Sequence, residues 1–222
     1  MEKKIRYVTL RYDDSENDYI DKIIEYIKTK EDLIVNFFEL EDKIKNIYGN
    51  IWNDLNRFKK YLCETHANIY KTEDDIPNWV IGEGGNENGF ILVSWDLFKE
   101  RHPKDTFTNY CKDFVHEFVH QCIKLVNPKL LSIDWINEGL ATYLSGQGDE
   151  DEENSFHYDI RNFNPEMKTY NDKFMAVKYV IENYDDKYVK KLLNDYDFTL
   201  NETPRLIEEM IHYYNEIIKK HN

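Results

Sequence analysis

The chain has 222 residues, a formal net charge of −14 and a hydrophobic fraction of 41% that includes 17 tyrosines, 12 phenylalanines and 4 tryptophans. This apolar content is enough for a packed core and argues against global disorder. The negative charge repels phosphate groups, so we expect neither nucleic acid nor an anionic membrane surface among the partners.

The first residues predict a strand, because polar and apolar side chains alternate from Lys3 to Tyr12. This start does not resemble a secretory signal peptide, and no run of the sequence approaches the ~20 apolar residues of a membrane-spanning helix. The three cysteines form no C-x-x-C pair, which fits free thiols in a reducing compartment. We therefore expect a cytoplasmic protein.

The next segments predict a helix and then a hairpin. Isoleucines recur at helical spacing after a Ser/Asn/Asp capping cluster at 15–18, and the helical pattern continues to Gly49 and Asn50, a usual C-terminal signal. Residues 51–66 are ambiguous and favour a helix. Between residues 76 and 98, two runs of β-branched or aromatic residues flank a Gly/Asn cluster, which predicts a β-hairpin.

Helices dominate the remainder of the chain. Residues 106–126 predict a long helix that ends at Asn127-Pro128, and residues 132–145 predict a second helix that ends at Gly146. An acidic loop, "DEDEEN", follows at 149–154, and the later residues read as helices with charged faces.

These elements predict an α+β fold, with a small mixed β-sheet and helices in the N-terminal half and a mainly α-helical C-terminal half. We expect one domain over residues 1–222. Its α/β subdomain covers about 1–127 and its helical subdomain about 128–222.

The sequence "HEFVH" predicts part of a metal site within the long helix. Residues four apart lie on one helix face, so His116 and His120 can direct their imidazole nitrogens at one point. Glu117 is rotated by about 100° around the axis. It is therefore poorly placed to bind the same ion but well placed to contact a water on it.

Glu138 is the expected third ligand. Seventeen residues separate it from His120, enough to finish the first helix, turn at Pro128 and return along a second helix. A carboxylate among Trp135, Ile136 and Leu140 is costly to bury unless a cation such as zinc compensates it. The alternative is a surface glutamate in an ion pair. Three ligands leave one open coordination position, which is typical of catalytic zinc sites.

"HEFVH" followed by "WINEGLATY" resembles the gluzincin clan of zinc metallopeptidases, in particular the peptidase MA-like and aminopeptidase-N-like catalytic domains. The resemblance covers residues 113–145, with a spacing one residue shorter than is usual in the large aminopeptidases. It implies a zincin-like active-site cleft between the two halves and a Zn²⁺ ion held by His116, His120 and Glu138. Glu117 would be the general base that activates the zinc-bound water for hydrolysis of a peptide or protein substrate.

Two further motifs resemble parts of that clan. "TYNDKFMAVKYV" aligns with the segment whose tyrosine donates a hydrogen bond to the oxyanion, which gives this role to Tyr170. "GGNEN" resembles the G-x-M-E-N motif that captures a substrate amine, which gives that role to Glu87. Asn86 stands where the motif has methionine, so a plain hairpin tip is the alternative reading of this segment.

Other candidate residues flank these motifs. "FILVS" resembles the edge strand that pairs with an extended peptide, so Ile91, Leu92 and Val93 are expected to contact the substrate. Thr142, one turn after Glu138, is a candidate hydrogen-bond partner of a ligand histidine.

The sequence therefore predicts a zinc-dependent metallopeptidase, an enzyme with no nucleic-acid or membrane partner. An aminopeptidase that uses Glu87 to bind the substrate amine is one alternative. A catalytically silent zinc-binding interaction domain and a helical protein without metal are the others. The natural substrate and the oligomeric state stay open.

Overall fold

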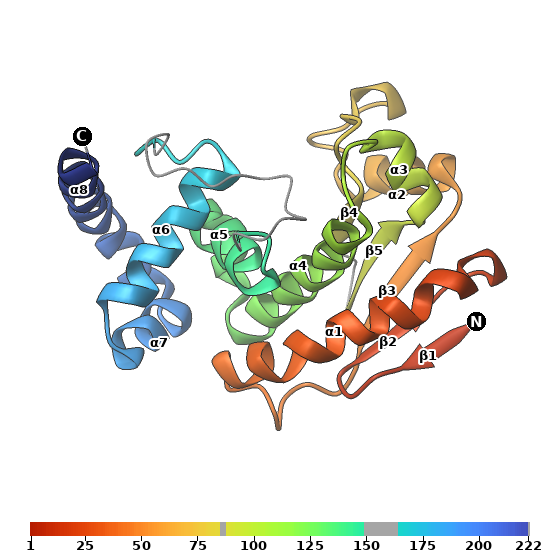
Figure 1. Cartoon of the computed structure of the whole chain (residues 1–222), viewed down its shortest axis with the longest axis horizontal. Helices are drawn as coiled ribbons and strands as arrows, with labels where there is room; N and C mark the ends of the chain where they lie inside the picture. The colour runs from red at the N-terminus through yellow and green to blue at the C-terminus, as the bar shows by residue number, and fades with distance from the viewer. Residues whose placement is uncertain (85–87, 149–163, 222) are drawn as a thin grey trace.

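The structure, a computed structural model, describes residues 1–84, 88–148 and 164–221. In this part of the chain, one five-stranded mixed sheet combines with eight α-helices (Figure 1). The strands are β1 (Glu2–Lys4), β2 (Val8–Arg11), β3 (Ile47–Trp52), β4 (Gly82–Gly84) and β5 (Gly89–Val93). The helices are α1 (Asn17–Phe37), α2 (Leu55–Thr65), α3 (Trp95–Arg101), α4 (Phe107–Val126), α5 (Asp134–Ser145), α6 (Tyr170–Asn183), α7 (Asp186–Asn194) and α8 (Tyr196–His221). The prediction of a small mixed sheet followed by helices is confirmed for the described residues.

The sheet has the strand order β1-β2-β3-β5-β4. The three inner strands run parallel, and β1 and β4 are antiparallel to their neighbours at the two edges. β4 and β5 form the predicted hairpin. The single strand predicted over residues 3–12 is wrong, because the chain turns after β1, where the Ile5 amide donates to the Val8 carbonyl at 2.7 Å, and returns as β2.

The helix predicted to continue to Gly49 ends at Phe37 instead. Glu39 has a φ of 53°, a left-handed conformation that no α-helix contains, and residues 47–52 form the central strand β3. Gly49 is therefore a strand residue. A Cβ atom added there would lie 2.8 Å from Leu10 Cδ2 and from the Phe90 ring, so glycine allows the side chains of both flanking strands to close over β3.

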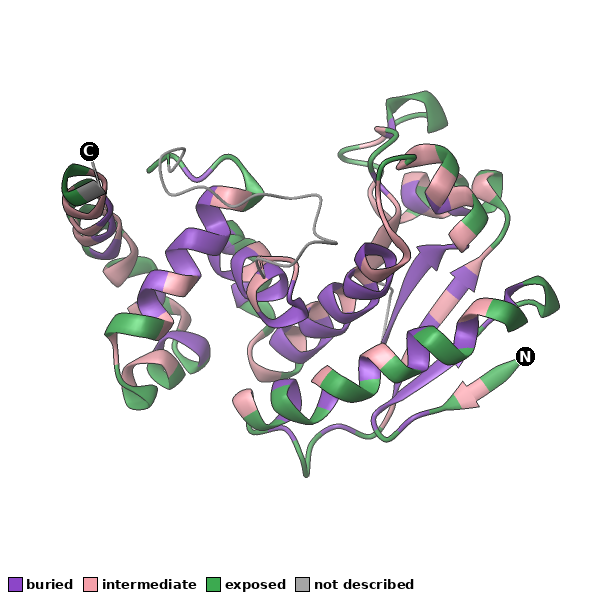
Figure 2. Ribbon diagram, viewed as in Figure 1, coloured by how far each residue is buried: buried purple, intermediate pink, exposed green. Residues whose placement is uncertain are grey.

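Helix α4 lies at the centre of the fold (Figure 2). It contacts α1, the strands β3, β4 and β5, and helix α5, so most of its circumference is buried. The Thr106 side chain caps its first turn by accepting from the Asn109 amide at 3.2 Å. The fully buried Tyr110 donates from its hydroxyl to the Val93 carbonyl at 2.8 Å, which fixes α4 against β5.

A short connection joins α4 to α5. The predicted break at Asn127-Pro128 is confirmed: Asn127 ends α4, and its side chain accepts from the Lys129 amide at 3.2 Å to begin a 3₁₀ turn, Pro128–Ser132. α5 ends before Gly146, as predicted, and packs against α4 on one side and α6 on the other. None of the described helices is both long enough and apolar enough to cross a membrane.

Candidate metal centre

Two histidines of α4 share one helix face. His116 and His120 have ring centroids 4.6 Å apart and ring planes at 83° to each other. The helix is rigidly packed at this point, because the neighbouring residues Val115, Phe118 and Val119 are each at most 1% exposed. The arrangement expected from the four-residue spacing is therefore present, and the surrounding core holds it in place.

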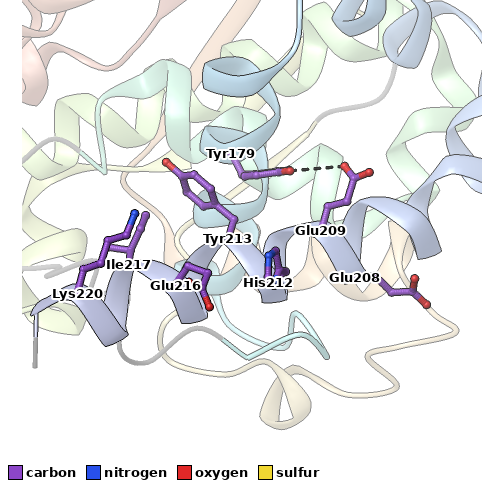
Figure 3. A pocket seen from close by; sticks show the side chains of 8 residues that line it. All are labelled: Tyr179, Glu208, Glu209, His212, Tyr213, Glu216, Ile217 and Lys220. Carbon is purple, nitrogen blue, oxygen red and sulfur yellow. Dashed lines mark hydrogen bonds between the residues drawn. The ribbon is translucent and has the colours of Figure 1, made fainter.

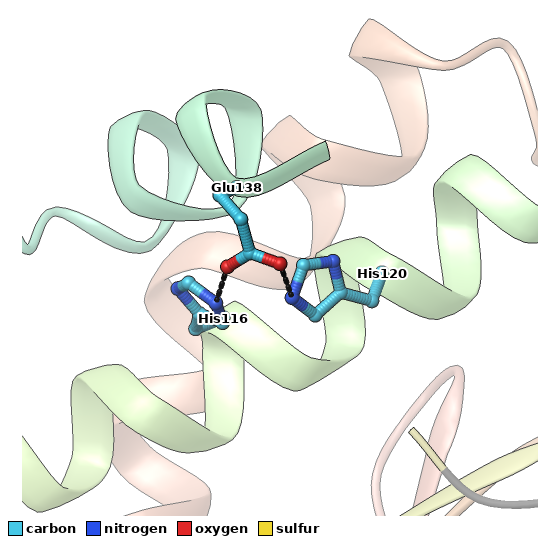
Figure 4. Close-up of side chains that lie close together, drawn as sticks. All are labelled: His116, His120 and Glu138. Carbon is cyan, nitrogen blue, oxygen red and sulfur yellow. Dashed lines mark ion pairs between the residues drawn. The ribbon is translucent and has the colours of Figure 1, made fainter. Parts of the chain in front are cut away.

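Glu138 approaches the two imidazoles from α5 (Figure 4). Its Oε2 atom lies 3.3 Å from His116 Nε2, and its Oε1 atom lies 3.6 Å from His120 Nε2. One donor atom of each residue falls within 4.8 Å of those of the other two. Two imidazole nitrogens and a carboxylate oxygen are donors that a zinc ion accepts, so these three side chains could hold one.

Amide side chains orient both imidazole rings. His116 Nδ1 lies 2.8 Å from Gln147 Oε1, and His120 Nδ1 lies 2.8 Å from Asn137 Oδ1. The amide orientations are fixed in turn by carboxylates, since Gln147 Nε2 donates to Asp113 at 2.7 Å and Asn137 Nδ2 donates to Glu138 at 3.1 Å. An amide oxygen can only accept, so Nδ1 of each ring carries a proton, and Nε2 is the nitrogen that each ring turns towards Glu138.

Thr142 does not have the role that the sequence suggested. Its hydroxyl is fully buried and has no hydrogen-bond partner among the described residues, so the prediction that it supports a ligand histidine is wrong. Asn137 and Gln147 take that role. Sequence reasoning missed both of them, although Asn137 precedes Glu138 directly. Gln147 follows Gly146, which ends α5 in the left-handed conformation with a φ of 80°; the glycine is a local signal for the helix end but not for the contact of the next side chain with His116.

Burial and neighbouring charges shift the pKa values of all three side chains in the cluster. Burial by itself lowers the pKa of His116, but the contact with Glu138 and the charges of Glu117 and Asp113 outweigh it and raise the pKa to about 9. Burial raises the pKa of Glu138, whereas the two histidines lower it to a net value of about 2. Burial and the neighbouring His116 charge lower the pKa of His120 to about 4. Glu138 is therefore ionised at neutral pH.

Glu117 lies on α4 beside the cluster and faces the edge strand β4. Its Oε2 atom is buried without a hydrogen-bond partner among the described residues. Burial raises the pKa of its carboxyl to about 8, and the charges of Glu83 and Glu138 act in the same direction. A Cβ atom added at Gly82 would lie 3.0 Å from Glu117 Oε1, so glycine at this position leaves room for the carboxylate.

Tyr170 lies next to the same cluster. It is the first residue of α6, behind a capping box in which the Thr169 and Asp172 side chains bond each other's backbone amides. Its ring centroid is 6.1 Å from that of His116. Burial and the carboxylates of Glu138 and Glu117 raise the pKa of its hydroxyl well above the ordinary value, so the phenol keeps its proton and can donate a hydrogen bond.

The prediction that β5 is an edge strand is wrong. β5 pairs with β3 on one side and β4 on the other, so the main chain of Ile91, Leu92 and Val93 has no free edge. The edge strand beside Glu117 is β4, and it carries Glu83, whose Oε1 lies 2.9 Å from His66 Nε2. Glu87, the predicted amine-binding residue, lies outside the described residues.

A cavity of about 360 Å³ opens beside the cluster. His116, Glu117 and Tyr170 form part of its wall, together with Leu92 and residues of α3 and of the segment before β4. A separate hollow of about 490 Å³ lies along α8, where Tyr179 faces Glu209 (Figure 3). None of the residues that line this second hollow belongs to the histidine cluster, so the cavity beside Glu117 is the one relevant to the candidate centre.

Comparison of the chain with models of known protein families, with curated proteins and with solved structures found no match.

Proposed function

We propose that the chain is a zinc-dependent peptide hydrolase of the gluzincin type. The observation that carries the proposal is the convergence of His116 Nε2, His120 Nε2 and the Glu138 carboxylate, with both Nδ1 atoms engaged by amide oxygens. Three protein ligands with a cavity beside them are the arrangement of a catalytic zinc site rather than a closed structural one. A zinc ion held there would polarise a substrate carbonyl and acidify water.

Glu117 is the general base in this proposal. Its buried Oε2 atom lacks a hydrogen-bond partner among the described residues, and the raised pKa of about 8 matches a group that exchanges protons near neutrality. It accepts the proton of the attacking water and then passes it to the leaving amine. Asn137 and Gln147 keep the two imidazoles in the orientation that the centre requires.

Tyr170 stabilises the charge that develops on the carbonyl oxygen. Its hydroxyl is protonated over the whole physiological pH range, and its ring lies beside His116 in the wall of the cavity. A donor in this position acts mainly in the transition state, when the oxygen becomes negative.

The edge strand β4 is where we place an extended substrate. It pairs with β5 on one side only, and Gly82 brings its main chain against Glu117. An extended peptide can add to such an edge through main-chain hydrogen bonds, so we propose peptide chains rather than single small molecules as the substrates. The zincin-like cleft of the proposal is the space between β4 and the cluster.

Metal analysis of protein purified without a histidine tag tests the proposal first. We expect one zinc ion per chain, loss of peptide hydrolysis on titration with a chelator, and recovery on adding zinc. Glu117→Gln should keep the zinc and lose at least about 100-fold in kcat, because it removes the base and none of the ligands. Zinc binding without hydrolysis in the wild-type protein would indicate a silent zinc-binding domain instead, and full activity of Glu117→Gln would exclude Glu117 as the base.

A further inference from the structure

The cavity beside Glu117 has one apolar wall. Val80, Ile81, Leu92 and Phe98 line it, from the segment before β4, from β5 and from α3. All but Ile81 are mostly buried, with exposed fractions of 7% or less. A wall of this kind accommodates the methylene groups of a long side chain.

The rest of the cavity wall is polar and carries three carboxyl groups. Asp113 and Asp105 line it in addition to Glu117, together with His102 and His116, and no lysine or arginine occurs among the described residues that line it. Asp113 Oδ1 accepts from Gln147 at 2.7 Å, and Asp105 Oδ2 lies 3.0 Å from His102 Nδ1. The two aspartates are thus held in place by neighbours. Burial raises the pKa of the Asp113 carboxyl to about 7, so a cationic group in the cavity would stabilise its ionised form.

Glu117 connects this cavity to the proposed chemistry. It belongs to the cavity wall, and its buried Oε2 atom has no partner among the described residues, which points to a ligand in the space in front of it. A side chain that enters the cavity therefore belongs to a residue next to the bond that is cleaved.

We propose that this cavity binds the lysine or arginine side chain of a substrate residue adjoining the scissile bond, with Asp113 and Asp105 as the residues that select it. The assignment rests on the proposed peptide hydrolase function. An apolar side chain would displace water from Asp113 and add no cation beside it, and burial of a carboxylate without such compensation is unfavourable. A lysine or arginine places its stem against the apolar wall and its cation beside the aspartates.

The test compares lysine with norleucine, which has a similar unbranched stem and no charge. Two peptide series place one or the other residue at each position of a single parent peptide in turn, and mass spectrometry maps each cleavage. We expect kcat/KM for lysine next to the cleaved bond to exceed that for norleucine by about 30-fold or more, as for a desolvated charge pair. Equal values would overturn the proposal and make the cavity a pocket for apolar side chains.

Asp113→Asn tests the contribution of the Asp113 charge to the preference for lysine. The asparagine oxygen can still accept from Gln147, so the support of His116 is retained and zinc content should not change. The lysine-to-norleucine ratio should fall at least tenfold; an unchanged ratio in a zinc-loaded variant would exclude Asp113 as the selecting residue. Asp105→Asn serves if Asp113→Asn does not fold. Glu100→Gln, which removes an exposed charge of α3 outside the cavity, is the matched control and should leave the ratio unchanged.

Binding measurements separate this proposal from the hydrolase proposal. Zinc-loaded Glu117→Gln, with and without Asp113→Asn, is titrated with the two peptide series by calorimetry. Suppose that the wild-type protein cleaves no peptide, that the Glu117→Gln protein binds lysine peptides more tightly than norleucine peptides, and that Asp113→Asn removes this preference. The cavity would then be a binding site for cationic side chains, and the hydrolase proposal would be wrong. Equal affinity for both series, or no binding of either, overturns the pocket.

Discussion

Replacing Asn137 with leucine should weaken zinc binding by about 30-fold without removing a ligand. The side chain holds two of the three ligands at once, because Oδ1 faces His120 Nδ1 at 2.8 Å and Nδ2 donates to Glu138 at 3.1 Å. A hydrogen bond to a neutral group contributes about 1 kcal/mol and one to a carboxylate about 1.5–3 kcal/mol. Because Asn137 is only half-buried, we take the combined loss as about 2 kcal/mol.

The assay is competition between the protein and a fluorescent chelator of known affinity, at fixed pH. Thr142→Val is the matched control, because the Thr142 hydroxyl is buried in the same helix with no hydrogen-bond partner among the described residues, and valine keeps the shape of the side chain. Its zinc affinity should equal that of the wild-type protein. If Asn137→Leu binds zinc within about threefold of the wild-type value, the amide does not orient the ligands and the reasoning fails.

Three further predictions concern the same centre. Tyr170→Phe should lower kcat by about 100-fold with little change in KM, because the hydroxyl acts on the transition state; a change confined to KM would exclude that role. Gly82→Ala should retain zinc but lower kcat by about tenfold, because the added Cβ would lie 3.0 Å from Glu117 Oε1. Gly84→Ala on the same strand is the control and should leave kcat unchanged. Equal kcat values for the two variants would mean that Glu117 has room to move. In chelator-treated protein the urea midpoint should fall as the pH rises to about 9. The pKa of Glu117 is raised from 4.5 to about 8 and that of His116 from 6.5 to about 9, so the stability that each proton confers is lost between the two values of its pKa; a flat profile would contradict both shifts.

The convergence of His116, His120 and Glu138, the proposed metal ligands, could be predicted because it depends on local geometry. The spacing of His116 and His120 fixes their common face on any helix, and the short connection to α5 leaves few places for Glu138. The supporting amides could not be predicted in the same way. Which of Asn137, Thr142 or Gln147 reaches a ring nitrogen depends on the rotation of α5 against α4 and on the path of the chain after Gly146.

The errors in the sheet have a common cause. The sequence pattern predicts the first residues of β3 as a continuation of helix α1. Their strand conformation depends on pairing with β2 and β5, which are distant in sequence. The same dependence explains the wrong edge strand. The hairpin of β4 and β5 was predictable from its turn residues, but the order of strands is not encoded locally, and β3 occupies the side of β5 expected to be free.

The number of residues between His120 and Glu138 fixes the position of the carboxylate relative to the two imidazoles. Asn127 terminates one helix and begins the 3₁₀ turn that leads to the next, so little slack exists between His120 and Asp134. One extra residue between Asp134 and Glu138 would swing the carboxylate by about 100° around the helix axis. Insertions between Asp134 and Glu138 would therefore disable the centre as surely as loss of a histidine.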